Sequence, residues 1–365
     1  TLPSHARHRF DRVLAGMVAV FAVGWAFGVA EAARTGTPLT AGLTRAPLAR
    51  PTDDARPEAA FVLDALVGAL VDARPLRGRS GALRVVIPGP GEDPEVSLPD
   101  SLASEVAVEL RPMGRAPEGP EAGGTGSPPD EGLSTVRSGV WALTLRSGER
   151  VRTVPGLRVL TQLPLEAKRG GRIGRYVMGH WPFERGGTPP GEAYETPAGV
   201  IRVREHDVDL RVSDHFRLGD FLTKGQEQVW PKYVVISTRL LDKLELTLQE
   251  LERTGHGVTD VGVISGFRTP DYNAHGGDTR GRGGLSRHMW GDAMDFYVDD
   301  DGDGCMDDLT GDGTVDVRDA RLLARAAERV EGAWPELVGG ISAYPPTVAH
   351  CGFVHVDTRG YRARW

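Results

Sequence analysis

Two stretches of this chain predict its C-terminal fold and chemistry: Ser286-Arg287-His288-Met289-Trp290-Gly291-Asp292-Ala293-Met294-Asp295 and, sixty residues on, Phe353-Val354-His355-Val356-Asp357. Imidazole and carboxylate groups are good zinc ligands, and a catalytic zinc takes three protein ligands with a fourth position open. We therefore predict that His288, Asp295 and His355 bind zinc. His288 and Asp295 are seven positions apart, which predicts two extended segments joined by a tight turn at Gly291. Either residue alone would also fit an ordinary surface histidine or a turn aspartate.

The surrounding motifs carry a resemblance to a known family. The pattern Ser-x-His-x-x-Gly-x-Ala-x-Asp from Ser286, the upstream run from Ser265 to Pro270 with Tyr272-Asn273, and the ending from His355 to Thr358 resemble the zinc D-Ala-D-Ala carboxypeptidase and Hedgehog N-domain superfamily, in its YcbK-like branch. The resemblance covers about residues 212–365. It implies an α+β domain, with a small antiparallel sheet and helices, that hydrolyses amide bonds in peptidoglycan peptides as a carboxypeptidase or an endopeptidase.

The resemblance also implies substrate-binding residues. Arg268 and Ser286 would engage a carboxylate or carbonyl oxygen of the peptide, with Asn273 as a further candidate. A guanidinium group suits a carboxylate because its N–H groups match the two oxygens. The alternative for Arg268 is an ion pair that holds its own loop.

The proton carrier is less clear. The best-known carboxypeptidases of the superfamily have Glu-x-x-His, whereas this chain has Gly352 three residues before His355. We predict His350 or Asp357 as the catalytic base, since histidine titrates near neutral pH and Asp357 lies two residues beyond His355 on an expected strand; a residue outside these motifs is the open alternative. Asp357 would alternatively orient a ligand imidazole. The missing glutamate keeps open a second function, a non-catalytic zinc-binding module that recognises cell-wall peptide or a protein partner.

A second metal site is predicted in an acidic insertion, residues 299–319. The loop from Asp308 to Asp319 resembles the calcium loop of dockerins, with a glycine at its sixth position, Gly313. Its oxygen ligands would be Asp308, Thr310, Asp312, Thr314, Asp316 and Asp319. The acidic run from Asp299 precedes it. We predict a structural calcium ion here. The alternatives are a solvated acidic insertion and, as a third function, a calcium-dependent adhesion or docking protein.

The N-terminus predicts export. Residues 13–30 are uncharged and follow three arginines, which fits a signal anchor near the lower length limit of a membrane span or a cleaved signal peptide. We place the rest of the chain in the cell envelope, periplasmic or extracytoplasmic. In such an oxidising compartment Cys305 and Cys351 would pair; the alternative is two unpaired buried thiols. The net charge of −7 gives no reason to expect a nucleic-acid partner.

The chain of 365 residues is predicted to hold two folded units. We expect the signal segment at 1–33, a linker at 34–57, a small β-rich domain at 58–165 with a flexible loop at 116–131, a Gly/Pro-rich connecting strap at 166–211, and the zinc peptidase domain at 212–365. Tyr176, Trp181 and Tyr194 are the expected packing points of the strap. Leucines spaced at three and four residues predict an amphipathic helix from Val234 to Glu252.

Overall fold

The computed structural model describes residues 83–94, 106–113, 138–280 and 282–365, all within the compact unit Pro57–Trp365. The predicted signal segment, the linker and the loop 116–131 lie outside these residues. Within the described part of the chain, no helix combines the length and apolarity that a membrane span requires.

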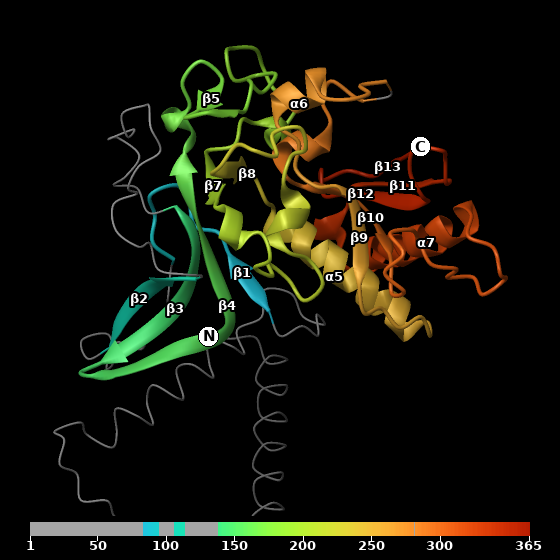
Figure 1. The fold of residues 1–365 in the computed structure, drawn as a ribbon, viewed down its shortest axis with the longest axis horizontal. Coiled ribbons are helices and arrows are strands. Elements are labelled where there is room, and N and C mark those ends of the chain that lie inside the picture. The colour runs from blue at the N-terminus through green and yellow to red at the C-terminus, as the bar shows by residue number, and fades with distance from the viewer. Residues whose placement is uncertain (1–82, 95–105, 114–137, 281) are drawn as a thin grey trace, which may run out of the picture. The chain divides into compact units, whose positions relative to one another are not determined.

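The first sheet takes four of its six strands from the segment predicted to be β-rich (Figure 1). Its order is β2-β3-β4-β7-β8, and β1 pairs in parallel with β4. The strands are β1 (Arg84–Val86), β2 (Ala107–Pro112), β3 (Gly139–Ser147), β4 (Arg150–Pro164), β7 (Gly199–Val203) and β8 (Lys232–Val234). Two residues, Gly148 and Glu149, connect β3 to β4 in the manner of a tight hairpin.

The strap is a folded part of the same unit. It contains η1 (Leu165–Ala167), β5 (Arg172–Ile173), β6 (Tyr176–Val177), η2 (Glu192–Tyr194), β7 and η3 (Glu205–Asp207). Tyr176, Trp181 and Tyr194 are buried, which confirms them as packing points. Because β7 pairs with β4 on one side and β8 on the other, one sheet takes strands from all three predicted segments. The domain bounds at 165 and 211 stay a prediction.

The second sheet confirms the expected α+β class. Its order is β13-β11-β12-β10-β9; every neighbouring pair is antiparallel except β11 with β13. The strands are β9 (Val261–Ser265), β10 (Ala293–Val298), β11 (Gly340–Tyr344), β12 (Phe353–Asp357) and β13 (Ala363–Arg364). The remaining helices are η4 (Leu218–Phe221), α5 (Thr238–Arg253), α6 (Pro270–His275), η5 (Arg287–Trp290), α7 (Val317–Ala333) and η6 (Pro335–Leu337). Helix α7 packs on β11, β12 and α5.

Helix α5 confirms the predicted leucine face and adds a correction. It begins at Thr238 rather than Val234, because Val234 ends strand β8. Its leucines are buried, but so are Lys243 and Glu245, which lie outside the leucine stripe. Both polar side chains find partners. The Lys243 ammonium donates to Glu331 at 2.7 Å, and Glu245 binds the ring of His215 at 2.8 Å.

Candidate metal centre

One transverse row of paired residues crosses the second sheet. Ser265 of β9 faces Asp295 of β10, Asp295 faces His355 of β12, and His355 faces Ser342 of β11. Residues directly opposite each other on adjacent strands present their side chains on the same face. The register of the sheet therefore brings Asp295 and His355 together although sixty residues separate them.

The three predicted zinc ligands converge. The Asp295 carboxylate lies 2.7 Å from His355 Nδ1 and 3.2 Å from His288 Nε2, and those two ring nitrogens are 3.3 Å apart. All three side chains are buried, and one ligand atom from each lies within 4.8 Å of the others. Two imidazole nitrogens and a carboxylate oxygen gathered in this way can hold a metal ion.

Each imidazole ring is oriented by a partner at the ring nitrogen that faces away from the cluster. His288 Nδ1 is 2.7 Å from the carbonyl oxygen of Gly266, which can only accept a hydrogen bond, so Nδ1 carries the proton and Nε2 faces the cluster. His355 is turned the other way, with Nε2 at 3.2 Å from the Asp357 carboxylate and Nδ1 toward Asp295. Such outer partners set the ring orientation of metal-binding histidines.

Burial and mutual contact shift the pKa values of the cluster. Burial favours a neutral Asp295, but His288 and His355 outweigh it and hold the pKa of that carboxyl well below its usual value. Burial lowers the pKa of His288. Burial also opposes charge on His355, yet its hydrogen bonds to Asp295 and Asp357 raise the pKa to about 9.

The local turn differs from the expected pair of extended segments. Asp295 lies on a strand, but His288 lies in the 3-10 helix η5, closed by hydrogen bonds from Met289 N to Ser286 O and from Gly291 N to His288 O. The predicted tight turn at Gly291 is present, with φ of 66°. A Cβ atom at Gly291 would stand 2.1 Å from the Val235 carbonyl oxygen, so only glycine fits.

The strap holds this turn in place. Trp181 donates its indole N–H to Met289 O at 2.8 Å, and Trp290 donates to Glu195 O at 2.8 Å. Arg287 forms a buried ion pair with Asp292 at 2.6 Å and also donates to Ala193 O. The segment 166–211 therefore supports the turn that carries His288.

The predicted substrate residues occupy different positions. Arg268 lies beside the cluster: its Nε donates to Ser265 Oγ at 2.7 Å, and its Nη2 donates to Asp295 at 2.8 Å. Ser286 precedes η5, and its side chain makes no capping hydrogen bond. Asn273 is buried in α6 and donates to the Gly283 carbonyl, so it holds the loop that leads to Ser286.

The two predicted proton carriers, Asp357 and His350, lie in different surroundings. Asp357 is fully buried, and its carboxylate accepts from Gly340 N at 2.7 Å and from the Arg359 guanidinium at 2.9 Å, besides facing His355. Burial raises its pKa, but the His355 and Arg359 contacts hold that pKa well below the usual value. His350 lies in the loop before β12, with Nδ1 at 2.9 Å from Cys351 O and its ring against Phe353.

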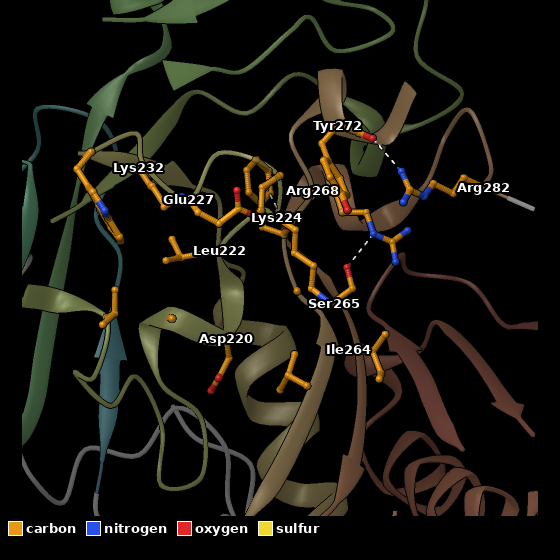
Figure 2. A pocket seen from close by; sticks show the side chains of 17 residues that line it. Asp220, Leu222, Lys224, Glu227, Lys232, Ile264, Ser265, Arg268, Tyr272 and Arg282 are labelled. Carbon is orange, nitrogen blue, oxygen red and sulfur yellow. Dashed lines mark hydrogen bonds between the residues drawn. The ribbon is translucent and has the colours of Figure 1, made fainter. Parts of the chain in front are cut away.

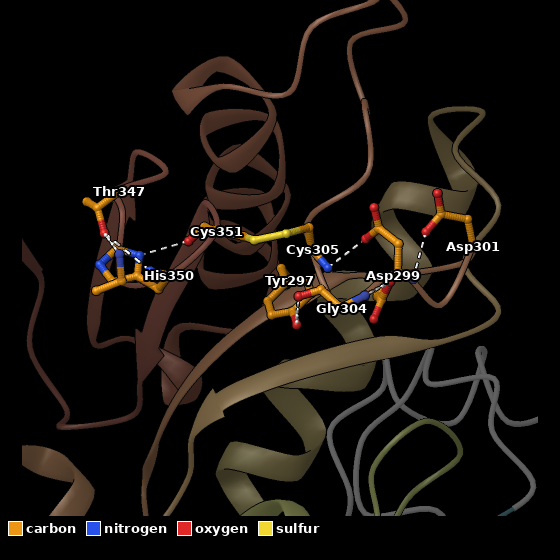
Figure 3. Close-up of a disulfide and its surroundings, with 10 residues drawn as sticks. Tyr297, Asp299, Asp301, Gly304, Cys305, Thr347, His350 and Cys351 are labelled. Atoms are coloured by element: carbon orange, nitrogen blue, oxygen red, sulfur yellow. Dashed lines mark hydrogen bonds between the residues drawn. A yellow bond between two sulfur atoms is a disulfide. The ribbon is translucent and has the colours of Figure 1, made fainter.

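The structure pairs Cys305 with Cys351 (Figure 3). This disulfide joins the acidic insertion after β10 to the segment just before β12, which is the predicted pairing of the two cysteines. His350 stands beside it in the same view. The disulfide thus links the two segments that lead away from Asp295 and toward His355.

The acidic insertion has two groups of carboxylates. Asp299, Asp301 and Asp307 lie close enough to hold a metal ion together, on partly exposed positions. In the loop predicted to bind calcium, Asp308 accepts from Gly313 N at 2.6 Å and Asp319 accepts from Thr310 N at 2.9 Å. The remaining predicted ligands are Asp312, Thr314 and Asp316; Arg318 pairs with both aspartates. Calcium in this loop stays a prediction.

Several residues of the site have no signal in the sequence motifs. Arg359 binds Asp357, and Lys243 donates to the Asp357 carbonyl oxygen at 2.6 Å from beneath the sheet. Trp365 is different, because the resemblance includes it together with Arg362; its ring lies 5.2 Å from the His355 ring. A buried lysine on an amphipathic helix has no local pattern that distinguishes it from a surface one.

Comparisons with protein-family models, curated proteins and solved structures found no match for the chain.

Proposed function

We propose that this chain is an exported zinc-dependent peptidase that hydrolyses amide bonds in peptidoglycan peptides. The observation that carries the proposal is the buried convergence of His288, Asp295 and His355, with both imidazoles oriented from behind. The motif resemblance to the D-Ala-D-Ala carboxypeptidase and Hedgehog N-domain superfamily supplies the metal and the substrate class. Cell-envelope location rests on the N-terminal apolar segment of the sequence.

The donor set fits zinc. His288 Nε2, His355 Nδ1 and an Asp295 oxygen would hold the ion, in keeping with the three nitrogen and oxygen ligands of catalytic sites. Bound zinc supplies a water molecule of lowered pKa and polarises a carbonyl group. The chain's own residues set the tautomer of each ring and exclude bulk water from the cluster.

Arg268 would position the peptide. Its guanidinium is tied to Ser265 and Asp295 through two of its N–H groups, and the guanidinium group has five. The remaining N–H groups can donate to a carbonyl or carboxylate oxygen beside the metal. The ion pair with Asp295 keeps the Arg268 guanidinium at the edge of the centre.

Asp357 is best assigned as a positioning residue. A carboxylate that already accepts from Gly340 and Arg359, and whose pKa is lowered, is a poor proton acceptor near neutral pH. His350 stays the predicted proton carrier. Its Nδ1 is occupied by the Cys351 carbonyl, and its Nε2 would have to exchange the proton.

The second candidate is a non-catalytic zinc-binding module. One observation favours it: Gly352 stands where the best-known carboxypeptidases of the superfamily carry a glutamate base, and Asp357, the carboxylate beside His355 that is not a predicted ligand, is engaged by Arg359. The two candidates differ in hydrolysis, not in metal or peptide binding.

One experiment separates them. The zinc-loaded full chain is incubated with purified peptidoglycan, and released fragments are identified by mass spectrometry. We expect new peptide ends with the natural sequence and with Arg175→Gln, an exposed position, and none with His355→Ala. Peptide binding without any new ends across the pH range would support the binding module instead.

We also propose a structural calcium ion in the loop 308–319. The spacing of its oxygen groups carries this proposal, and the carboxylates of Asp308, Asp312 and Asp316 would repel one another less with a cation bound.

A further inference from the structure

A pocket of about 550 Å³ adjoins Arg268 on the β9 side of the metal centre (Figure 2). Its walls come from the segment between η4 and β8, from β9 and from α6. Pockets of this size commonly hold small ligands or several atoms of a longer one. Since Arg268 belongs both to the pocket lining and to the surroundings of Asp295, a peptide at the metal would extend into this space.

The pocket is rich in basic groups although the chain as a whole is acidic. Four basic side chains line it against two carboxylates: Lys224, Lys232, Arg268 and Arg282 against Asp220 and Glu227. Both carboxylates are engaged by the backbone. Asp220 accepts from Arg217 N at 2.6 Å, and Glu227 accepts from Gly225 N at 2.8 Å.

Three of the four basic groups are also engaged. Lys232 donates to the Gln226 carbonyl and lies over the Trp230 ring, and Arg282 donates to Tyr272 O at 2.8 Å and Gly276 O at 2.6 Å. Arg268 binds Ser265 and Asp295.

Lys224 differs from these three. Its side chain extends within the pocket toward Ser265 (Figure 2). Within the described residues, neither a hydrogen bond nor an ion pair engages its ammonium. A compact, strongly hydrated ammonium with three donors readily binds a carboxylate.

We propose that this pocket selects peptides that carry a free carboxylate, and that Lys224 distinguishes the carboxylate from its carboxamide. The inference rests on the proposed function, because it takes the ligand to be a peptide bound at the metal centre. Tyr272 and Leu222 offer apolar surface for the carbon chain that bears the carboxylate. Arg282, over the Tyr272 ring at 4.9 Å, adds positive charge at the same wall. The chemistry recognised is an anionic oxygen pair outside the hydrolysed amide.

The test uses three synthetic stem peptides: the free acid, an analogue amidated at an internal carboxyl, and an analogue amidated at the C-terminus. Dissociation constants are measured with the metal-free full chain, whose fold is checked by circular dichroism, and kcat/KM is measured with the zinc-loaded chain. We expect the natural protein to prefer the free acid over at least one analogue by about fivefold, a typical worth of one charge-assisted contact at a partly exposed site.

Variants show whether Lys224 makes the distinction. Lys224→Gln should bind the free acid and that analogue equally, Lys224→Arg should keep the preference, and the exposed Arg175→Gln should match the natural protein. A preference that survives Lys224→Gln, or equal binding of all three peptides by the natural protein, would overturn the inference.

The result is separable from the proposed function. Carboxylate preference without hydrolysis would leave the pocket assignment intact and point to the binding module. Hydrolysis of all three peptides at equal kcat/KM would leave the peptidase intact and remove the selective role of Lys224.

Discussion

The His288–Asp295–His355 cluster of the second sheet and the acidic loop 308–319 both gather groups that could bind a cation, but they are built in opposite ways. At the cluster, His288 and His355 are buried and turned inward by partners behind them. In the loop, Asp308 and Asp319 accept from the loop's own backbone, and Arg318 pairs with its neighbours. Other protein groups hold the side chains of the cluster in place, whereas the carboxylates of the loop are engaged by the loop's own backbone and by Arg318. We therefore expect the cluster to bind its ion more tightly than the loop binds a cation, and substitutions at the cluster to have larger effects.

The largest expected effect is loss of the metal. His355→Ala removes one of three ligands, and the zinc content after dialysis should fall from about one ion per chain to near zero. Elemental analysis measures it. His206→Ala, at an exposed position on η3, is the control and should retain zinc. Equal zinc content in both variants would show that the cluster is not the binding site.

The next effect concerns support beneath the cluster. Lys243→Met leaves Glu331 without one buried partner, and Glu331 retains only Arg364 and Gly339. We expect the free energy of unfolding to fall by about 3 kcal/mol. Arg318→Met in the acidic loop breaks exposed pairs and should cost at most about 1 kcal/mol. Urea unfolding of both variants makes the comparison, and equal losses would contradict it.

A smaller effect is expected at the outer partner of His355. Asp357→Asn keeps the size of the side chain and removes its charge, so zinc affinity should fall by about tenfold to a hundredfold. Competition with a chromogenic chelator gives the affinity. Asp292→Asn changes a buried carboxylate that binds Arg287 instead and should lower stability more than zinc affinity. The reverse pattern would show that Asp357 only supports the fold.

The smallest effect is expected in the loop. With calcium at roughly ten times its dissociation constant, the unfolding free energy of the zinc-loaded chain should rise by about 1.4 kcal/mol. Asp312→Asn should lose this increase, whereas Asp209→Asn, at an exposed site outside the loop, should keep it. Thermal unfolding with and without calcium measures the difference. If calcium does not change the stability of the natural chain, the predicted calcium site in the loop is wrong.

The sequence predicts the centre better than its surroundings. The spacing of His288, Asp295 and His355 and the motifs around them are specific enough to predict a metal site. The strands 261–265 and 353–357 have the apolar runs that are typical of buried strands. The 3-10 conformation at His288 could not be read, since it depends on how Gly291 packs against Val235. The pairing of β7 with β4 is also long-range, and local patterns do not encode partners of that kind.

The periodicity of α5 does not show which of its polar residues become buried. Lys243 lies outside the leucine stripe, yet it is buried, and its ammonium donates to Glu331 of α7 and to the carbonyl oxygen of Asp357 at the end of β12. A helix covered on two sides buries part of its polar face, and only the tertiary partner reveals which part. The role of Arg359 could not be predicted for the same reason. Its carboxylate partner, Asp357, is two residues away in sequence but lies inside the sheet.

The transverse row Ser265–Asp295–His355–Ser342 has a consequence for folding. The β9–β10 pairing shifts register next to Asp295, and a slip of one residue along any strand sends its side chains to the opposite face. Asp295 and His355 face each other only in one alignment of β10 with β12. A metal ion that binds both Asp295 and His355 would stabilise that alignment and no other. Zinc binding during folding would therefore favour the native register of the sheet over a shifted one.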